Sequence, residues 1–180
     1  TPRNFTFRSR EFEQAEMEFF CHPSEREKWF THWLEFRHQF HLDIGFDPSL
    51  LRIRPHAQDE LAHYARAASD IEFLFPFGWQ EIEGIHDRGD WDLSRHTQYS
   101  GKELAITDEE TKERYTPMVI ETSVGVDRTA LALLVAAYRE EQLADGETRT
   151  VMKFHPAIAP IKAAVLPLSK KLAEPAEAIQ

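Results

Sequence analysis

Residues 5 to 20 restrict the fold most, because their polar and apolar side chains are arranged as in one long β-strand with two different faces. In an extended strand, successive side chains point to opposite faces. One face would be polar with a single ring: Arg8, Arg10, Phe12, Gln14 and Glu16. The other would be apolar: Ala15, Met17 and Phe19. The segment therefore predicts a sheet with one core face and one face that is open to a ligand.

The chemistry of the polar face favours a ligand with several kinds of group. Two guanidinium groups suit phosphates, an aromatic ring suits a flat base, and a carboxylate suits a cation. A purely structural strand has little reason to align charges of both signs around a ring. We interpret this face as a binding surface.

Composition limits the classes of function. The chain has 180 residues, enough for one domain and the start of another, and a formal net charge of −10. A sequence-independent nucleic-acid binder would be basic, so any contact with nucleic acid must use a local patch such as Arg3, Arg8 and Arg10. The lone Cys21 excludes an internal disulfide and predicts a reducing compartment, the cytoplasm. No membrane span or signal peptide is recognisable, and the first residue is not Met, so we expect a fragment.

Apolar periodicity predicts the other elements. Pro23-Ser24-Glu25 begins a helix, with Ser24 as N-cap, and the apolar stripe that follows is Trp29, Trp33, Phe36 and Phe40. Strands are expected at residues 51–54, 71–75, 79–85, 115–121 and 163–168, and a second helix from Gly125 through Tyr138. Residues 86–112 look like a long surface loop containing a short ladder.

Two further groups of residues suggest chemistry. Glu81 and Glu83 would share one strand face, and with Arg88 nearby they could hold Mg²⁺ beside a triphosphate. The alternative is an edge strand with solvated acids. Glu121 and Ser123 would share another face, followed by Gly125 and Arg128 at a helix N-terminus, which favours anions.

Taken together, the three groups predict a phosphate end, an aromatic shelf and an acidic pocket for an ammonium group. Such a site would join a nucleotide to a small amino acid. This hypothesis requires that the three regions converge around one cavity.

The motifs resemble those of a known family. Arg8-x-x-x-Phe12 resembles the second half of motif 2 of class II aminoacyl-tRNA synthetases, and Gly125-Val126-Asp127-Arg128 resembles motif 3. Longer segments are similar to glycyl-tRNA synthetases of the homodimeric type: residues 7–14, 83–85, 88, 90–93 and 121–128.

The resemblance implies an α+β fold, an antiparallel β-sheet flanked by helices. Residues 1–148 would be the C-terminal part of the catalytic core, and residues 149–180 a linker and the first strand of an α/β anticodon-binding domain, entered at Ala157 to Leu168. The implied reaction uses ATP, with Mg²⁺, to form glycyl-adenylate, and then transfers glycine to glycine tRNA. A cytoplasmic homodimer without membrane contact is expected.

The resemblance also assigns roles to residues. Arg8 would bind the γ-phosphate, Phe12 would stack on adenine, and Arg128 would lie against the other side of the nucleotide; Arg8 and Arg128 are the catalytic residues. The ATP set is Phe7, Arg8, Ser9, Arg10, Glu11, Phe12, Glu81, Ile82, Gly125, Val126, Asp127 and Arg128. The glycine set is Phe12, Glu13, Gln14, Ala15, Glu16, Arg88, Glu121, Thr122, Ser123, Val124 and Gly125. Within it, Glu16, Glu121 and Ser123 would hold the ammonium group and Arg88 the carboxylate. Glu81 and Glu83 would serve ATP or its Mg²⁺, and residues 2–4 would face the tRNA acceptor end.

The family's motif 1 and the first strand of motif 2 are absent from the sequence, so we expect the chain alone to be a poor enzyme. Two alternatives remain open. One is a catalytically silent synthetase-like subunit of a nucleic-acid enzyme, and the other is an adenylate-forming enzyme that uses no tRNA.

Overall fold

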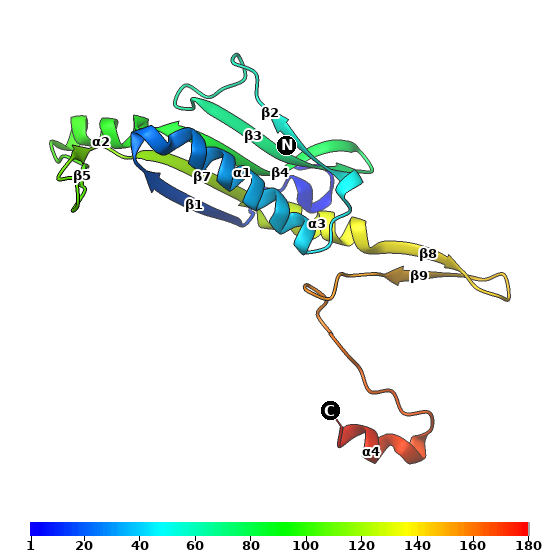
Figure 1. Cartoon of the computed structure of the whole chain (residues 1–180). Helices are drawn as coiled ribbons and strands as arrows, with labels where there is room; N and C mark the ends of the chain where they lie inside the picture. Colours follow the sequence, from blue (N-terminus) through cyan, green and yellow to red (C-terminus); the bar gives the residue numbers. More distant parts are fainter. Residues whose placement is uncertain (180) are drawn as a thin grey trace.

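A five-stranded antiparallel sheet organises the computed structural model, which describes residues 1–179 (Figure 1). The strand order is β1-β7-β4-β3-β2. The strands are β1 (Gln14–Cys21), β2 (Leu51–Pro55), β3 (Ala67–Phe75), β4 (Gly78–Gly89) and β7 (Met118–Gly125). The predicted fold class, an antiparallel sheet with flanking helices, is therefore confirmed.

The first strand begins later than the sequence pattern predicts. Residues Phe5–Phe7 form a single 3-10 turn, and β1 starts only at Gln14, where pairing with Gly125 of β7 begins. Asn4 and Phe5 both have φ of 54°, a left-handed conformation that no strand allows. The prediction of one strand over residues 5–20 is therefore wrong in its first half. Consequently strand alternation does not place Arg8, Arg10 and Phe12 beside Glu16.

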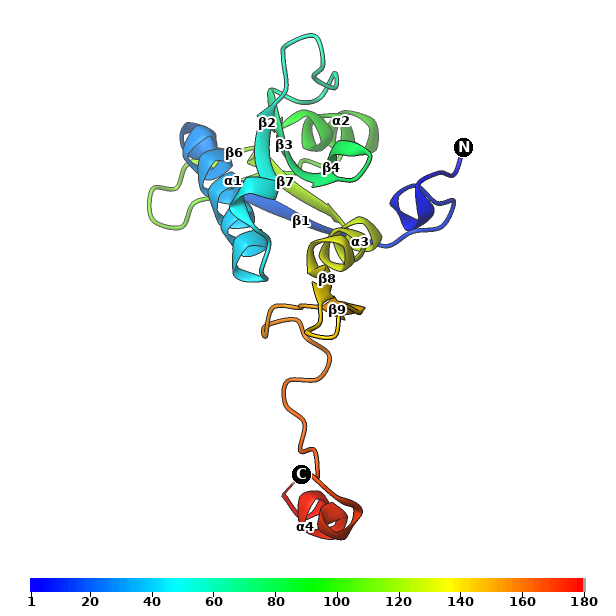
Figure 2. The same cartoon turned by 90° about the vertical axis from the view of Figure 1, so that its right-hand side faces the viewer.

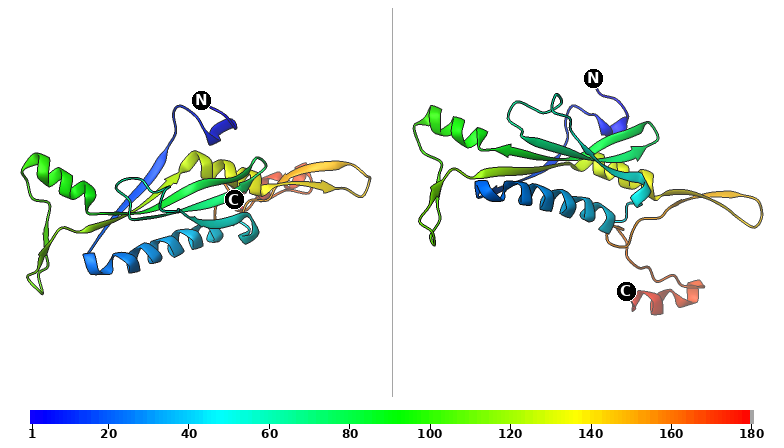
Figure 3. Two further views of the ribbon diagram at one scale, coloured as in Figure 1. Left: turned by 90° about the horizontal axis from the view of Figure 1, so that it is seen from above. Right: turned by 45° about the horizontal axis from the view of Figure 1, so that its top comes forward.

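Helix α1 (Arg26–Asp43) lies along one face of the sheet, and the N-terminal segment lies on the opposite side (Figure 3). Trp29 and Trp33 pack against Phe19 of β1, with ring centroids 4.5 and 5.4 Å apart. This confirms that the tryptophans belong to the core. Phe36 and Phe40 are exposed instead. Ser24 is not the N-cap, because a 3-10 turn (Pro23–Glu25) precedes the helix and the His22 side chain accepts the Ser24 N–H.

The core lies between the β3–β4 hairpin, β7 and the helices. Its fully buried members are Ile71, Phe73, Ile82, Ile85 and Ile120. Complete burial of such a side chain stabilises the fold by roughly 1.5–3 kcal/mol. Gly78 turns the hairpin with φ of 103°, a conformation that other residues rarely adopt. The two strands expected at residues 71–75 and 79–85 thus form a hairpin with Gly78 at its turn.

Beyond β4, the chain extends into a short subassembly at one end of the sheet. It consists of α2 (Trp91–Ser100), β5 (Ile106–Thr107) and β6 (Arg114–Tyr115). The predicted ladder is present as β5 and β6, which pair antiparallel. Helix α2 was not predicted, because its polar sequence has no apolar stripe. Gly101, with φ of 70°, ends it.

Helix α3 (Val126–Ala137) ends at Ala137, one residue before the predicted limit. Tyr138 already belongs to a two-stranded ribbon of β8 (Tyr138–Gln142) and β9 (Thr148–Met152), which extends away from the sheet (Figure 1). A turn that includes Asp145 and Gly146 closes this ribbon.

The C-terminal segment leads away from the sheet and carries only one short helix, α4 (Ala173–Glu177) (Figures 1 and 2). Residues 163–168 do not form the predicted strand, because no neighbouring strand pairs with them. Leu166 and Leu168 are 83% and 97% exposed. The assignment of residues 149–180 to the start of another domain stays a prediction. Within residues 1–179, no helix is both long and apolar enough to cross a membrane.

Candidate active site

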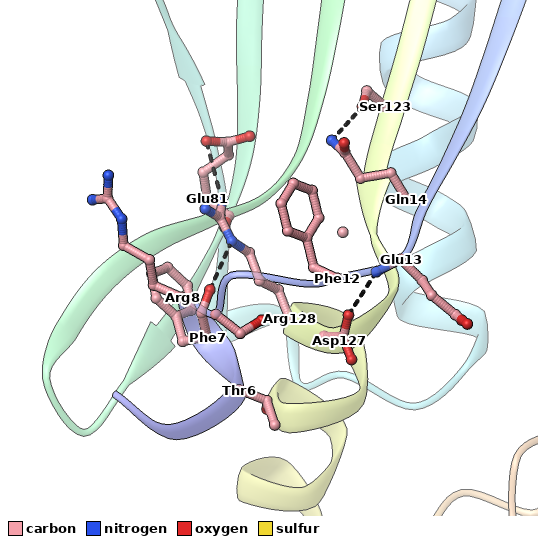
Figure 4. Close-up of a pocket in the computed structure, with 12 residues that line it drawn as sticks. Thr6, Phe7, Arg8, Phe12, Glu13, Gln14, Glu81, Ser123, Asp127 and Arg128 are labelled. Atoms are coloured by element: carbon pink, nitrogen blue, oxygen red, sulfur yellow. Dashed lines mark hydrogen bonds and ion pairs between the residues drawn. The ribbon is translucent and has the colours of Figure 1, made fainter. Parts of the chain in front are cut away.

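Three segments that are distant in sequence line a single cavity of about 480 Å³ (Figure 4). The N-terminal segment contributes Thr6, Phe7, Arg8, Ser9, Phe12, Glu13 and Gln14. Strand β4 contributes Glu81, and the β7–α3 junction contributes Ser123, Gly125, Asp127 and Arg128. The predicted convergence of the three regions is confirmed.

Arg128 connects all three segments. Its guanidinium lies over the Phe7 ring, 4.5 Å from the centroid. The Nε atom donates to the Phe7 carbonyl at 3.3 Å, and one terminal nitrogen donates to the Glu81 carbonyl at 3.1 Å. That nitrogen also lies 3.4 Å from the Glu81 carboxylate. The guanidinium is therefore fixed in the cavity before any ligand binds.

The N-terminus of α3 holds the segment that precedes β1. The Asp127 carboxylate accepts the Glu13 N–H at 2.8 Å, and the Val126 N–H donates to the Glu13 carbonyl at 3.0 Å. Gly125 permits close packing here, since a β-carbon would lie 3.3 Å from the Arg128 side chain. These contacts place Phe12 at the cavity, with its ring 60% exposed and free to stack. Arg10 and Glu11 are exposed and do not line the cavity.

Beyond Ser123 the site becomes acidic. Glu16 and Glu18 of β1 lie opposite Ser123 and Glu121 of β7. The Ser123 hydroxyl donates to Glu16 at 3.1 Å and accepts from Gln14 at 3.4 Å. This is the predicted grouping of Glu16, Glu121 and Ser123. The sequence analysis missed Glu18, although continued alternation from Glu16 would have found it.

Arg88 neutralises part of this acidic region. It donates to Asp92 at 2.8 Å and to Glu121, and its guanidinium lies 4.4 Å from the Tyr64 ring centroid. Burial opposes its charge, but the hydrogen bonds to Asp92 and Glu121 prevail and raise the pKa of Arg88. Partial burial, followed by the charge of Glu121, raises the pKa of Glu18. Asp92 and Tyr64 were not predicted, and only the i, i+4 spacing of Arg88 and Asp92 could have signalled one of them.

The predicted placement of Glu81 and Glu83 on one strand face is wrong. A β-bulge shifts the register of β3 and β4, so that Ile71 pairs with Glu83 but Glu72 pairs with Glu81. Glu83 is consequently buried against α1, where it accepts from Arg37 at 2.5 Å and His41 at 2.7 Å. The Ile82 side chain is in the core, 1% exposed.

Three residues of the predicted glycine set have side chains on the opposite face of the sheet from Glu16 and Ser123, because side chains alternate along β1 and β7. Ala15 and Val124 are register partners, one position away from the pair Glu16 and Ser123, so their side chains point to the other face. Thr122 is buried, with 4% of its surface exposed. Only the backbone of these residues remains near the site.

The described residues, 1–179, contain no group of three His, Cys, Asp or Glu side chains that could hold a metal ion. Glu81 alone remains of the predicted Mg²⁺ ligands, and it is about half exposed. One carboxylate suits Mg²⁺, which usually keeps several waters and binds substrate phosphates.

Burial raises the pKa of Cys21 to about 11, so this thiol stays protonated at neutral pH.

Solved structures with similar folds define the fold class. Seryl-tRNA synthetase from Pyrococcus horikoshii, complexed with ATP, matches 85% of the chain with a TM-score of 0.65 and 17% identity, over 32% of its own length. Giardia lamblia prolyl-tRNA synthetase, in complex with prolyl-adenylate, matches 73% with a TM-score of 0.57 and 13% identity, over 25% of its length. The fold is therefore that of class II aminoacyl-tRNA synthetases.

Curated relatives of similar sequence are glycine–tRNA ligases. Glycine–tRNA ligase of Geobacillus kaustophilus is 56% identical over 99% of the chain, and that of Clostridium tetani is 56% identical over 96%. The chain is homologous to a segment of the glycine–tRNA ligases. It spans 39% and 37% of the length of these two relatives. No protein-family model matches the chain.

Proposed function

We propose that this chain is the part of a glycine–tRNA ligase that binds ATP and glycine and forms glycyl-adenylate. The observation that carries the proposal is the convergence of three motif-bearing segments on one cavity. Glycine is proposed as the amino-acid substrate because the chain is 56% identical, over nearly its whole length, to a glycine–tRNA ligase.

ATP would bind in the cavity around Arg128. The exposed Phe12 ring offers a surface for adenine, and Arg128 offers a cation whose position is already fixed by Phe7 and Glu81. Arg8 would meet the terminal phosphate. A cation that is already in position stabilises the transition state more than a mobile one, because it need not move when negative charge develops on the phosphate.

Glycine would bind at the acidic end, beyond Ser123. Glu16, Glu121 and the Ser123 hydroxyl would hold its ammonium group. Arg88 has five N–H donors, and its pairs with Asp92 and Glu121 leave others for the carboxylate.

The chemistry requires no protein nucleophile. A carboxylate oxygen of glycine attacks the α-phosphorus of ATP, the bond to the bridging oxygen breaks, and pyrophosphate leaves with its electron pair. The enzyme holds the two reactants in line and stabilises the added negative charge with Arg8 and Arg128. Bound Mg²⁺ would neutralise phosphate charge, with Glu81 as the protein group closest to that role.

Further parts of the proposal concern the whole protein. Transfer of glycine to glycine tRNA, a homodimeric assembly and a cytoplasmic location follow from the proposed function. Because the chain spans only part of its relatives, we propose that the isolated 180 residues are weakly active at most.

The test is glycine-dependent exchange of pyrophosphate into ATP, followed by charging of glycine tRNA, by a protein of the relatives' length that contains this chain. We expect exchange with glycine, and a loss of about 100-fold or more in Arg128→Ala. The matched control is Arg149→Ala on the exposed β9 ribbon, which should be unaffected. Absence of exchange would refute the proposal and favour a silent subunit, and exchange without charging would favour an enzyme that uses no tRNA.

A further inference from the structure

One side chain on the ligand face of the sheet has no role in the proposed site. His86 of β4 lies between Ala68 of β3 and Glu121 of β7 in the register. Two residues earlier on the same face, Gly84 pairs with Ser123. His86 is thus a direct neighbour of the residues proposed to hold the ammonium group.

The imidazole of His86 leans across Gly84. A β-carbon at Gly84 would lie 2.7 Å from His86 Cε1 and 3.5 Å from each ring nitrogen. Real β-carbons do not approach other atoms so closely, so the ring occupies the space that a side chain at position 84 would take. Neighbouring strands are about 4.8 Å apart, which places the ring beside Ser123.

The Nδ1 atom of His86 is buried and has no hydrogen-bond partner within residues 1–179. A buried polar atom without a partner is unfavourable, and an aliphatic side chain would fill the same space without that penalty. The unpaired nitrogen leaves one polar edge of the ring for a ligand or for solvent, while the bulk of the ring does not depend on that nitrogen.

We propose that the His86 imidazole is the wall that restricts the amino-acid pocket to glycine. This inference rests on the proposed function. With the ammonium group held by Glu16, Ser123 and Glu121, the ring lies beside the substrate's α-carbon. Hydrogen fits there, whereas the methyl group of alanine would meet the ring. Gly84 contributes because it has no side chain and so leaves room for the Cε1 edge of the imidazole.

The experiment compares exchange of pyrophosphate with glycine and with alanine, in a protein of the relatives' length that contains this chain. His86→Ala should raise kcat/KM for alanine relative to glycine by about tenfold or more, the range that one methyl group carries in a hydrophobic pocket. His86→Leu, which keeps a wall, should retain the wild-type preference. The matched control is His96→Ala, on the exposed surface of α2.

A second variant tests the same geometry from the other side. Gly84→Ala should displace the ring and raise the KM for glycine with little change in kcat, and this effect should vanish in the double variant with His86→Ala. The inference would be overturned if His86→Ala left the ratio of kcat/KM for alanine to that for glycine unchanged. It would also be overturned if Gly84→Ala raised the KM for glycine equally with and without His86→Ala. Failure of the wild type to use glycine would instead refute the proposed function.

Discussion

Glu83 is the buried charge that ties α1 to the sheet. Its carboxylate is fully buried and receives hydrogen bonds from Arg37 and His41. Removing one member of a buried ion pair leaves the other uncompensated, at a cost of about 3–5 kcal/mol. We expect Glu83→Gln to lower the free energy of unfolding by about 3 kcal/mol, measured by urea denaturation with tryptophan fluorescence. A loss below about 1 kcal/mol, the size expected for the exposed control Glu147→Gln, would contradict this account.

The same carboxylate predicts a pH dependence. Burial alone would raise the pKa of Glu83, but the hydrogen bonds from His41 and Arg37 outweigh burial and lower the pKa below its usual 4.5. A lowered pKa in the folded state means that ionised Glu83 stabilises the fold fully above about pH 4.5, and that this contribution is lost as pH falls further. The difference in stability between wild type and Glu83→Gln should therefore shrink below about pH 4.5. A difference that grows on acidification would show that the sign is wrong.

At this scale, the sequence predicted the residues that carry a recognisable chemical pattern. Arg8, Phe12, Glu81 and Arg128 were named from charge and spacing, and all line the cavity. The face of Glu83 was not predicted, because the extra residue of the β-bulge is Ile82, and the nearby Gly84 does not by itself say at which residue the register shifts.

At the scale of elements, the junction of α3 with β1 shapes the cavity. Asp127 lines the cavity, and its carboxylate accepts the Glu13 N–H. Asp127→Ala should therefore speed hydrogen exchange at the Glu13 amide by about tenfold, as expected for loss of a hydrogen bond of about 1 to 1.5 kcal/mol. Asp127→Asn, which keeps an acceptor oxygen, should exchange close to the wild-type rate. Unchanged exchange in Asp127→Ala would show that this bond does not hold the segment.

Elements with a strong period were predictable, and elements stabilised by context were not. The tryptophan stripe identified α1, and alternating strands identified most of the sheet. Helix α2 has no stripe, and residues 163–168 have the composition of a strand but no partner to pair with. Secondary structure of these segments depends on neighbours that local sequence does not encode.

At the scale of the whole molecule, the sheet and its helices form the stable unit. The segment after residue 158 exposes Ile161, Leu166 and Leu168, and α4 lies apart from the sheet (Figure 2). The chain just before this segment is anchored, since a β-carbon at Gly45 would lie 2.3 Å from the His155 side chain. A chain that ends at residue 158 should melt within about 2 °C of the 180-residue chain in calorimetry, because little apolar burial is lost. A fall of more than 5 °C would show that the segment stabilises the sheet.

The central claim is that the cavity around Arg128 and the acidic group at Glu16, which adjoins it through Ser123, bind one ligand together. Calorimetric titration of a non-hydrolysable glycyl-adenylate analogue tests it most directly, with a protein of the relatives' length that contains this chain. We predict tight binding, weakened by about tenfold or more in both Arg128→Ala and Glu16→Ala, with Arg149→Ala unchanged, because hydrogen bonds to charged groups contribute about 1.5–3 kcal/mol. Binding of equal affinity in all four proteins, or no binding at all, would contradict the claim.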